Sequence, residues 1–539
     1  MKYKKDDDEL IKAKKVTPKR NHPKKSTKQA HMKLKKKKKH PFFKKIIFLL
    51  IISFFFVLVF LSYRFYRFQK LAKDMFNNTP SIIYDSSGNE IGQIGAERIR
   101  ENATLKEFPS NLINAYISIE DQRFYSHHGV DIKRTGAAII SYILKRGSSS
   151  FGGSTITQQL VKNLTGDNSN SIKRKVTEWF YAFNLEFFFS KEDLLNAYFN
   201  IIYTGPNIYG VKTASIYYFN KNVSDLSLAE CAFLAGLTNS PNSYNPYSEK
   251  DNSTKISSRT KVVLKKMLEL NYISEEEYNL ALADVNNGLK FKKGKFTKQN
   301  QSITSYHTDA LINEIINDFM KKENISHDFA TNYFYLSGST VYSTVNKDIQ
   351  NILEKESKNS NYILKSSNST DTSQAAIVVI DNETGFVAGC VGGLGEKNKS
   401  RTFNRATQMK RQTGSSMKPV AVLLPALDKK IITTVSLIDD SPTTFTDLQN
   451  HLYSPINYDG YKGTITLRQA VESSQNIPFV KIMEQLTPQT SISYLKKMGI
   501  TSLNKNDVNL SLALGGLDEG ISPLEFAGAY ATIANDRSI

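Results

Sequence analysis

Hydrophobic and polar residues follow several different spacings along the 539-residue chain. An uncharged run, IIFLLIISFFFVLVFLSY, covers the 18 residues from Ile46 to Tyr63, which is just long enough for a helix to cross the hydrocarbon core of a bilayer. In residues 108–245, apolar residues recur mostly at three- and four-residue intervals and aromatic residues are frequent. This pattern predicts a membrane-spanning helix followed by a mainly α-helical domain.

Two stretches of the chain predict β-strands. Residues 80–96, PSIIYDSSGNEIGQIGA, have the pattern of a short hairpin that turns at Ser-Gly-Asn. Residues 246–372 mix a charged helical stretch with further helix and strand, and the Ser/Asn-rich segment KSSNSTDTSQ precedes the next strand. That strand, Ala375–Asp381, opens the sequence AAIVVIDNETGFVAGCVGG, whose strand, turn and second strand indicate an α/β domain over 373–539.

The formal net charge of +20 is concentrated at the N-terminus. Residues 1–45 contain 19 Lys and Arg against 4 Asp and Glu, a net of 19 − 4 = +15, which leaves +5 for the rest of the chain. The segment has too little apolar content to form a core, so we predict a disordered tail. Because no aromatic residues interrupt its cluster of lysines, we expect it to lie near anionic lipid and not to bind nucleic acid.

The flanks of the apolar run predict its orientation in a membrane. The basic residues before Ile46 far outnumber those immediately after the run, which ends at Arg64 and Arg67. By the positive-inside rule this places the N-terminus in the cytoplasm and the following domains outside. A cleaved signal peptide is the alternative, but its apolar region would be shorter and followed by small residues, whereas this run leads into Tyr-Arg-Phe-Tyr-Arg.

The two cysteines exclude several classes of site. Cys231 and Cys390 lie in different predicted domains and both in apolar surroundings, AECAFLAGL and GFVAGCVGG. We therefore expect two free buried thiols and not a disulfide framework or a metal site. The sequence contains no zinc-ligand spacing, no P-loop and no dinucleotide-binding fingerprint.

Four motifs in the helical segment bring candidate catalytic residues together: EDQRFYSHHG, GGSTITQQLVKN, RKVTE and KEDLLNAYFN. They offer two glutamates, several cations and hydroxyl groups. Displacing a sugar from a diphosphate needs such a set, because one carboxylate removes a proton from the attacking hydroxyl while fixed cations neutralise the departing diphosphate. Each motif alone has a structural explanation: Arg174 and Glu178 at i, i+4 would form a surface ion pair, and His127 and His128 would be polar loop residues.

In this order the four motifs resemble the signature set of the peptidoglycan glycosyltransferases, over about residues 75–245. The resemblance implies a lysozyme-like helical fold that polymerises lipid II at the outer face of the plasma membrane. It implies that Glu120 is the catalytic acid/base at the acceptor sugar's 4-hydroxyl and that Glu178 is the second carboxylate. The residues that it places at the substrate, with the diphosphate contacts among them, are Ser154, Thr155, Gln158, Lys162, Arg174 and Lys175.

One position departs from this pattern. Many relatives carry a basic residue just before the second glutamate, where this chain has Thr177. We therefore expect one phosphate contact of the family to be missing here, while the chemistry is retained.

A second candidate site lies in the segment QTGSSMKP, which contains Ser415, Ser416 and Lys418. On a helix Lys418 reaches the residue three positions earlier but not the one two positions earlier, so it selects Ser415 and not Ser416. The following proline is tolerated only in a first helical turn, which predicts a helix start at about Gly414 or Ser415 and favours an oxyanion there. On its own, Ser415 could equally be an ordinary N-cap, because Ser-x-x-Lys is a common pattern.

Behind a glycosyltransferase segment, this motif resembles the active site of the penicillin-binding transpeptidases, and the pair of domains resembles the class A bifunctional penicillin-binding proteins. Ser474-Gln475-Asn476 matches the family's Ser-x-Asn element. The resemblance implies that Ser415 attacks a D-Ala-D-Ala stem peptide with Lys418 as its base, that Ser474 relays the proton, and that Asn476 holds the substrate amide.

The family's third element, Lys-Thr-Gly, does not occur in these 539 residues, and Lys462-Gly463-Thr464 has the wrong order and precedes Ser474. We therefore expect a transpeptidase domain that is incomplete at its C-terminus. Since the family takes one oxyanion-hole N–H from the missing strand, we expect slow acylation of this chain.

The predicted architecture is thus multidomain. It comprises a basic disordered tail (1–45), a single transmembrane helix (46–63), a mainly α lysozyme-like glycosyltransferase domain (75–245), a mixed α/β linker region (246–372) and an α/β serine transpeptidase domain (373–539).

Three hypotheses for function follow. The first is a membrane-anchored enzyme with both activities, the second a glycosyltransferase with a silent penicillin-binding remnant, and the third a non-catalytic cell-wall scaffold. The expected partners are lipid II, nascent glycan strands, stem peptides, β-lactams, moenomycin-type inhibitors, the membrane, and cell-wall synthesis and division proteins. No cofactor is required by the resemblance, and the sequence leaves open whether a divalent metal ion, Mg²⁺ or Mn²⁺, binds at the glycosyltransferase site.

Overall fold

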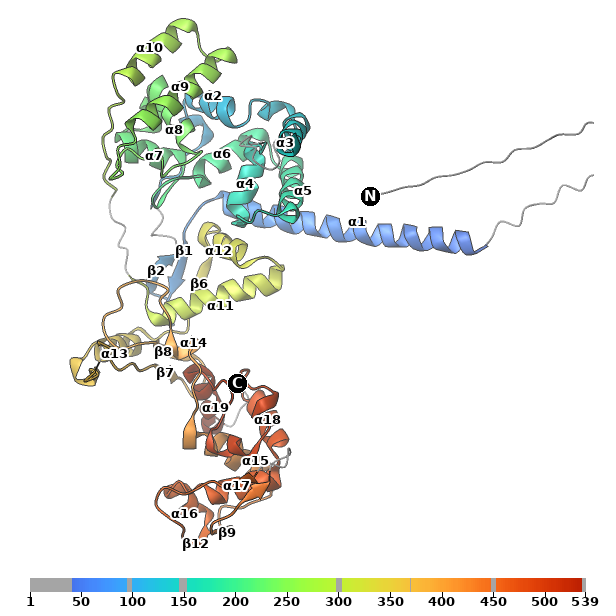
Figure 1. Cartoon of the computed structure of the whole chain (residues 1–539), viewed down its shortest axis with the longest axis vertical. Coiled ribbons are helices and arrows are strands. Elements are labelled where there is room, and N and C mark those ends of the chain that lie inside the picture. The colour runs from blue at the N-terminus through green and yellow to red at the C-terminus, as the bar shows by residue number, and fades with distance from the viewer. Residues whose placement is uncertain are drawn as a thin grey trace, which may run out of the picture. The chain divides into compact units, whose positions relative to one another are not determined.

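The computed structural model describes residues 41–94, 99–144, 153–296, 303–368, 370–446 and 452–535 (Figure 1). Most of the basic tail predicted for 1–45 lies outside these residues. The first helix, α1, extends from Pro41 to Phe76, well beyond the predicted span of 46–63. Its apolar part is the one helix of the described residues that is long and apolar enough to cross a membrane. The helix continues because Phe68 and Met75, past the apolar run, are buried in the core of the next domain.

The domain that follows is mainly helical, as predicted. Its helices are α2 (Ser110–Glu120), α3 (Ile132–Leu144), α4 (Ile156–Thr165), α5 (Ile172–Phe188), α6 (Lys191–Ile201), α7 (Val211–Phe219) and α8 (Leu228–Leu237). A small sheet, β3 (Ile99–Arg100), β5 (Ile208–Tyr209) and β4 (Tyr203–Gly205), lies at its edge. Helix α4 packs against α5 and α6, and α2 packs against α8.

The hydrophobic core of this domain continues beyond residue 245. Helices α9 (Ser253–Glu269) and α10 (Glu275–Asn286) contribute buried residues to the same core, including Val263, Met267 and Val285. The charged helical stretch that the sequence suggested for the linker region therefore packs on α8 and extends the helical domain.

The predicted hairpin forms and acquires a third strand. Strands β1 (Ser81–Tyr84) and β2 (Glu90–Ile94) pair antiparallel, and β6 (Thr340–Tyr342) pairs with β1 in parallel. Helices α11 (Tyr306–Glu323) and α12 (His327–Leu336) pack on one another, and α12 also contacts α4 and β1 (Figure 1). The sequence did not predict this joining of residues near 82 and 341.

The second predicted domain begins with the antiparallel pair β7 (Ile377–Ile380) and β8 (Val387–Val391), as the strand–turn–strand pattern indicated, and α13 (Lys347–Ser357), from the predicted linker region, packs on β8. Its other described α-helices are α14 (Arg405–Gln408), α15 (Leu424–Asp428), α16 (Leu467–Glu472), α17 (Ile477–Leu486), α18 (Pro488–Lys497) and α19 (Pro523–Asn535). Two further strand pairs are β9 (Leu437–Asp440) with β12 (Gly463–Thr466), and β10 (Phe445–Thr446) with β11 (Leu452–Tyr453).

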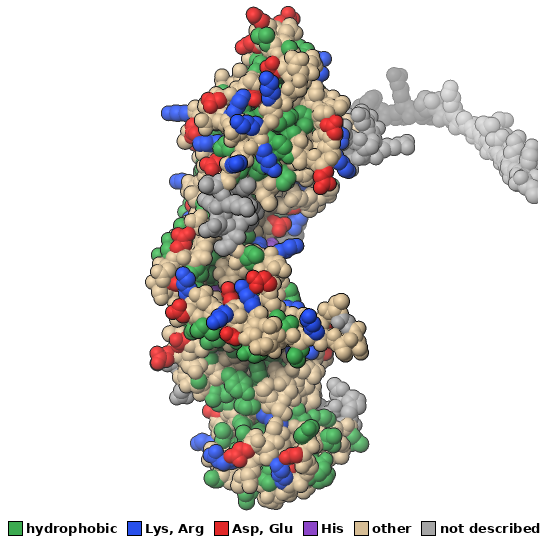
Figure 2. Space-filling model, turned by 90° about the vertical axis from the view of Figure 1, so that its left-hand side faces the viewer, with side chains coloured by type: hydrophobic (Ala, Val, Ile, Leu, Met, Phe, Trp, Pro, Cys, Tyr) green, Lys and Arg blue, Asp and Glu red, His purple; other side chains and the backbone are tan. Residues whose placement is uncertain are grey.

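Both cysteines are buried and free, as predicted. Burial raises the pKa of the Cys231 thiol to about 12 and that of Cys390 to about 11, so neither is a reactive thiolate near neutral pH. On the surface, Lys and Arg side chains are interspersed with Asp and Glu over the described residues that Figure 2 shows. This distribution agrees with the small net charge that remains after the N-terminal tail.

Candidate active sites

Glu120 is the last residue of α2, where its carboxylate is half-buried and hydrogen-bonded by two neutral groups. The Gln159 side-chain amide donates to one oxygen at 2.8 Å, and the Thr238 hydroxyl donates to the other at 3.0 Å. The Arg134 guanidinium donates to the backbone carbonyl of Glu120. Among the described residues, no Lys, Arg or His side chain forms an ion pair with this carboxylate.

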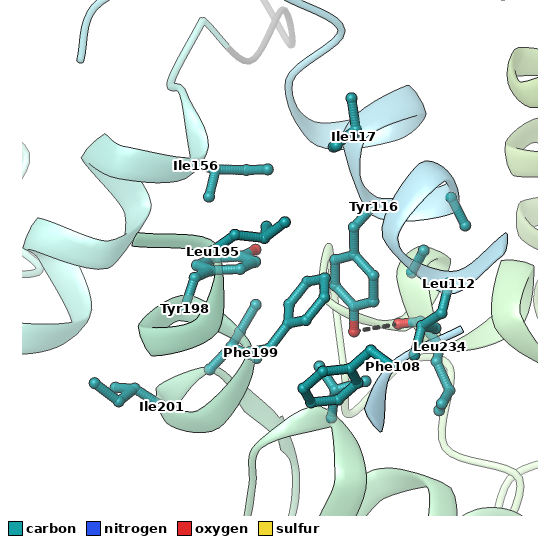
Figure 3. Packing of buried hydrophobic residues seen from close by; sticks show 14 of the residues in the cluster. Phe108, Leu112, Tyr116, Ile117, Ile156, Leu195, Tyr198, Phe199, Ile201 and Leu234 are labelled. Atoms are coloured by element: carbon teal, nitrogen blue, oxygen red, sulfur yellow. Dashed lines mark hydrogen bonds between the residues drawn. The ribbon is translucent and has the colours of Figure 1, made fainter. Parts of the chain in front are cut away.

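The helical core fixes the direction in which Glu120 points. Tyr116, one turn earlier on α2, is fully buried, and its hydroxyl donates to the backbone carbonyl of Leu234 at 3.1 Å (Figure 3). The Tyr198 hydroxyl donates to the side-chain oxygen of Gln159 at 3.1 Å, which turns the Gln159 amide toward Glu120. Burial raises the pKa of both tyrosines well above the ordinary value, so both stay hydrogen-bond donors.

Glu178 lies on α5 and is buried, with 4% of the side chain exposed. One of its oxygens accepts from the Gln158 side-chain amide at 3.0 Å, and Arg174 and Lys175 form ion pairs with the carboxylate. Lys175 also donates to the Ser154 hydroxyl at 2.7 Å. The structural explanation of Arg174 and Glu178 as a surface pair is therefore wrong, because the carboxylate is inside the domain.

The start of α4 places these groups. Thr155 is its N-cap and exchanges hydrogen bonds with Gln158, in a capping box that satisfies the free N–H groups of the first turn. The Thr155 hydroxyl itself donates to the carbonyl of Gly129 at 2.6 Å, so this predicted substrate residue is engaged in the structure. Asp121 accepts from the Ile156 N–H at 3.0 Å. His127 lies 2.8 Å from Asp121 and is a loop residue, as the sequence suggested, but it is buried.

Sequence reasoning missed three neighbours of Glu120. Gln159 directly follows the selected Gln158, and the adjacent pair divides its contacts: Gln159 binds Glu120, while Gln158 binds Glu178. The adjacent pair of glutamines was the sequence signal that could have identified Gln159. Thr238 lies 118 residues from Glu120 in sequence, so no local pattern could find it, and Arg134 acts on a backbone atom.

A pocket of about 350 Å³ lies beside Glu178. Four cations line it: Arg64, Lys162, Lys173 and Arg174. The Lys162 and Lys173 side chains are exposed, and neither has a hydrogen-bond or ion-pair partner among the described residues. The described chain contains no group of three or more His, Cys, Asp or Glu suited to a metal ion, and the Glu178 carboxylate is already occupied by cations.

Ser415 is exposed in a single 3₁₀ turn, Gly414–Ser416, that begins where a helix was predicted. The helical segment differs in type from a regular α-helix, because residues Pro419–Leu423 have π-helical geometry before α15 begins. Ser416 is turned away: its hydroxyl donates to the carbonyl of Thr413 at 2.6 Å. This agrees with the choice of Ser415 over Ser416.

Lys418 is buried beneath this turn, with 3% of the residue exposed. Its ammonium donates to the Ser474 hydroxyl at 3.0 Å, to the Ser474 carbonyl at 2.7 Å and to the Asn476 side-chain oxygen at 2.9 Å. Burial lowers the pKa of Lys418 to about 8. The structure therefore joins Lys418 to both predicted residues of the Ser-x-Asn element, and its described hydrogen bonds go to them and not to Ser415.

A buried network holds the Ser-x-Asn turn. Ser474 has a positive φ of 50°, an uncommon backbone conformation for serine. The Asn457 side-chain oxygen accepts from the N–H of Asn476 at 2.7 Å, and its amide donates to the buried Asp440 carboxylate at 2.8 Å. Lys462, of the reversed Lys-Gly-Thr sequence, forms an ion pair with Asp459 at 3.0 Å.

Two family models match two separate segments of the chain. The transglycosylase model covers residues 87–268, and the model of the penicillin-binding protein transpeptidase domain covers residues 375–538. Penicillin-binding protein 1A from Clostridium botulinum is 38% identical over 481 residues, across both matches. Over both segments the chain is similar to penicillin-binding proteins.

Two other penicillin-binding proteins are similar to this chain over most of its length. Penicillin-binding protein 1A from Clostridium perfringens is 37% identical over 78% of this chain, and penicillin-binding protein 1F from Bacillus subtilis is 35% identical over 86%. The chain spans 57% of the C. botulinum protein, 64% of the C. perfringens protein and 60% of the B. subtilis protein. A crystal structure of penicillin-binding protein 1A from Haemophilus influenzae aligns over 85% of this chain and 68% of that chain, with 22% identity and a TM-score of 0.45.

Proposed function

We propose that the helical domain polymerises lipid II into glycan strands. The observation that carries this proposal is the pair of carboxylates bound by adjacent glutamines of α4, one with neutral neighbours and one paired with cations. Because no cation among the described residues pairs with the Glu120 carboxylate, taking up a proton does not break an ion pair, which suits Glu120 as the general base. Glu178 instead anchors Arg174 and Lys175 beside the cationic pocket.

The proposed reaction uses these groups in one displacement. The 4-hydroxyl oxygen of the acceptor sugar attacks C1 of the donor, the bond from C1 to the diphosphate oxygen breaks, and the hydroxyl proton passes to Glu120. The lipid diphosphate leaves with the bonding electrons, and Lys162 and Arg174 stabilise its negative charge. The lysozyme-like architecture inferred from the resemblance belongs to the same proposal.

Polymer formation tests the proposal. The detergent-solubilised chain, incubated with lipid II, is expected to produce glycan polymer, and a moenomycin-type inhibitor is expected to abolish the product by competing for the same cleft. A folded chain that binds lipid II but never extends it would contradict the proposal and would favour the scaffold hypothesis.

We further propose that the second domain performs D-Ala-D-Ala transpeptidation through an acyl-serine. The Ser415 oxygen attacks the carbonyl of the penultimate D-Ala, its proton passes to neutral Lys418, and the terminal D-Ala leaves with a proton relayed through Ser474. The intact hydrogen bonds among Lys418, Ser474 and Asn476 support an active site more than a silent remnant.

Labelling with a fluorescent penicillin tests this second activity. A chain extended through a segment that carries Lys-Thr-Gly supplies the second oxyanion-hole donor and is expected to label. In that chain Ser415→Ala should abolish the label, whereas Ser416→Ala, one residue away, should keep most of it. Equal loss in both variants would remove Ser415 from the proposed role.

The membrane helix supports a plasma-membrane location, and we propose a single-pass topology with a cytoplasmic N-terminus and external catalytic domains. The partners proposed with it are nascent glycan strands, stem peptides, β-lactams, and cell-wall synthesis and division proteins.

A further inference from the structure

The pocket beside Glu178 has a wall that does not come from the glycosyltransferase motifs. Arg64 at the end of the apolar run, helix α4 and helix α5 form three sides. The fourth side is the corner between α11 and α12, Asn324–Ser326, with Phe329 behind it. This α11–α12 corner lies about 80 residues beyond the segment that resembles the glycosyltransferases.

The corner is fixed to α4 by specific contacts. The Asn332 side-chain amide donates to the carbonyls of Asn163 at 3.1 Å and Leu164 at 3.4 Å, at the C-terminal end of α4. Gly166, which ends α4 with a φ of 67°, approaches α12 so closely that an added Cβ would lie 2.9 Å from the Cβ of Asp328. These contacts with α4 therefore fix the position of the corner relative to Lys162, which lies on α4.

The membrane helix holds the corner from the other side. Arg67 forms an ion pair with Glu323 at the end of α11 and also donates to the carbonyl of Lys322 at 2.8 Å. The ring of Phe68 lies 5.9 Å from that of the buried Phe329. The pocket thus begins within one helical turn of the residue at which the apolar run ends.

The charges in the pocket suit a dianionic ligand. Its lining contains the four cations named above and two acids, Asp167 and Glu178, a net of 4 − 2 = +2. Like that of Lys162, the Lys173 side chain has no partner among the described residues, and Lys173 also lies one helical turn before Thr177, where a phosphate contact was expected to be missing. Residues four positions apart on a helix lie on the same face, so Lys173 can supply a positive charge on the face that carries Thr177.

We propose that Lys173 and the α11–α12 corner form a subsite for the lipid-proximal end of a polyprenyl diphosphate. Lys173 pairs with a diphosphate oxygen, and Ile325, with Phe329 behind it, contacts the first carbons of the polyprenyl chain. The proposal rests on the glycosyltransferase function above and adds two determinants of donor binding that the motifs do not contain. Since the pocket adjoins the end of the membrane helix, a ligand with its chain in the bilayer can reach it.

Binding of farnesyl diphosphate and inorganic pyrophosphate to the detergent-solubilised full chain tests the proposal by calorimetry. Lys173→Gln is expected to weaken both probes about ten-fold, as loss of one charge-assisted hydrogen bond does, and Lys173→Arg to restore them. Ile325→Ser should weaken farnesyl diphosphate several-fold and leave pyrophosphate unchanged. The matched controls are Lys255→Gln and Leu280→Ser, exposed residues of α9 and α10, which should bind both probes as the wild type does.

Several results would overturn the subsite. These are absence of farnesyl diphosphate binding in the wild type, normal binding by Lys173→Gln, or equal weakening of both probes by Ile325→Ser, which indicates a structural role. In polymerisation assays, Lys173→Gln should raise KM for the lipid donor and leave kcat nearly unchanged. If the wild-type chain polymerises glycan but Lys173→Gln binds both probes normally, the subsite is refuted and the proposed function is not. If the variants lose probe binding as predicted but the wild-type chain makes no polymer, the subsite is supported and the proposed function is refuted.

Discussion

Glu120 and Glu178 show how much of a residue's role depends on its neighbours. The sequence predicted both glutamates, the cations Arg174 and Lys175, and the transpeptidase set around Lys418, because each lies in a short motif. It could not predict that Glu120 is bound by Thr238, since that contact joins the ends of two helices 118 residues apart. Nor could it decide which glutamine faces which carboxylate, because neighbouring helical positions differ by about 100° and their direction depends on packing.

At the same scale, the lowered pKa of Lys418 predicts a pH dependence. With a pKa of about 8, half of the Lys418 side chains are neutral at pH 8, and the neutral fraction, which is the form able to accept a proton, rises with pH through that value. The ¹³Cε resonance of Lys418, assigned with Lys418→Arg, is expected to titrate near pH 8, whereas exposed lysines titrate at about 10.4. Titration of Lys418 together with the exposed lysines would contradict this account of its burial.

Among the elements, the local patterns could be predicted from the sequence, whereas the long-range pairings could not. The hydrophobic spacing predicted the helical domain and strands β1, β2, β7 and β8, because their patterns are local. It did not predict β6, which pairs in parallel with β1 from about 258 residues away, or the π-helical geometry after Ser415. Both depend on tertiary contacts, which override local preferences.

The turn at Gly515 leads to a specific prediction for the stability of the second domain. Gly515 has a φ of 77°, and an added Cβ would lie 2.3 Å from the carbonyl oxygen of Gly414, the residue directly before Ser415. Gly515→Ala should therefore destabilise the second domain by more than the roughly 1–2 kcal/mol that a left-handed conformation costs a non-glycine residue. Gly499→Ala is the matched control, because φ is 86° there and an added Cβ has nothing within 4 Å. Denaturant unfolding measures both, and equal shifts would show that the contact with Gly414 is unimportant.

For the whole molecule, the continuation of α1 past the membrane run is the main departure from the predicted domain limits. Residues 46–63 were predicted as the helix, but burial of Phe68, Leu71 and Met75 in the helical core makes the juxtamembrane turns part of the folded domain. Sequence periodicity could not show this, because the aromatic partners of Phe68, Tyr181 of α5 and Phe329 of α12, lie far along the chain. The pocket beside Glu178 consequently lies next to Arg64, directly after the apolar run of α1.

This organisation predicts a definite topology. In intact cells, external protease should remove the domains beyond about Arg64, while an epitope placed before Lys45 should survive, because the basic segment stays in the cytoplasm. Immunoblotting with antibodies to each end measures the outcome. Loss of the N-terminal epitope with retention of the catalytic domains would invert the orientation.

The central claim is that Glu120 is the general base of glycan polymerisation. Glu120→Gln keeps the size of the side chain but removes the proton acceptor, so kcat for polymerisation of lipid II should fall about 10²–10⁴-fold. Glu269→Gln, at an exposed ion pair on α9, is the matched control and should retain wild-type activity. With both variants folded by circular dichroism, a fall in Glu120→Gln alone is the predicted result. Near-normal polymer from Glu120→Gln would contradict the account.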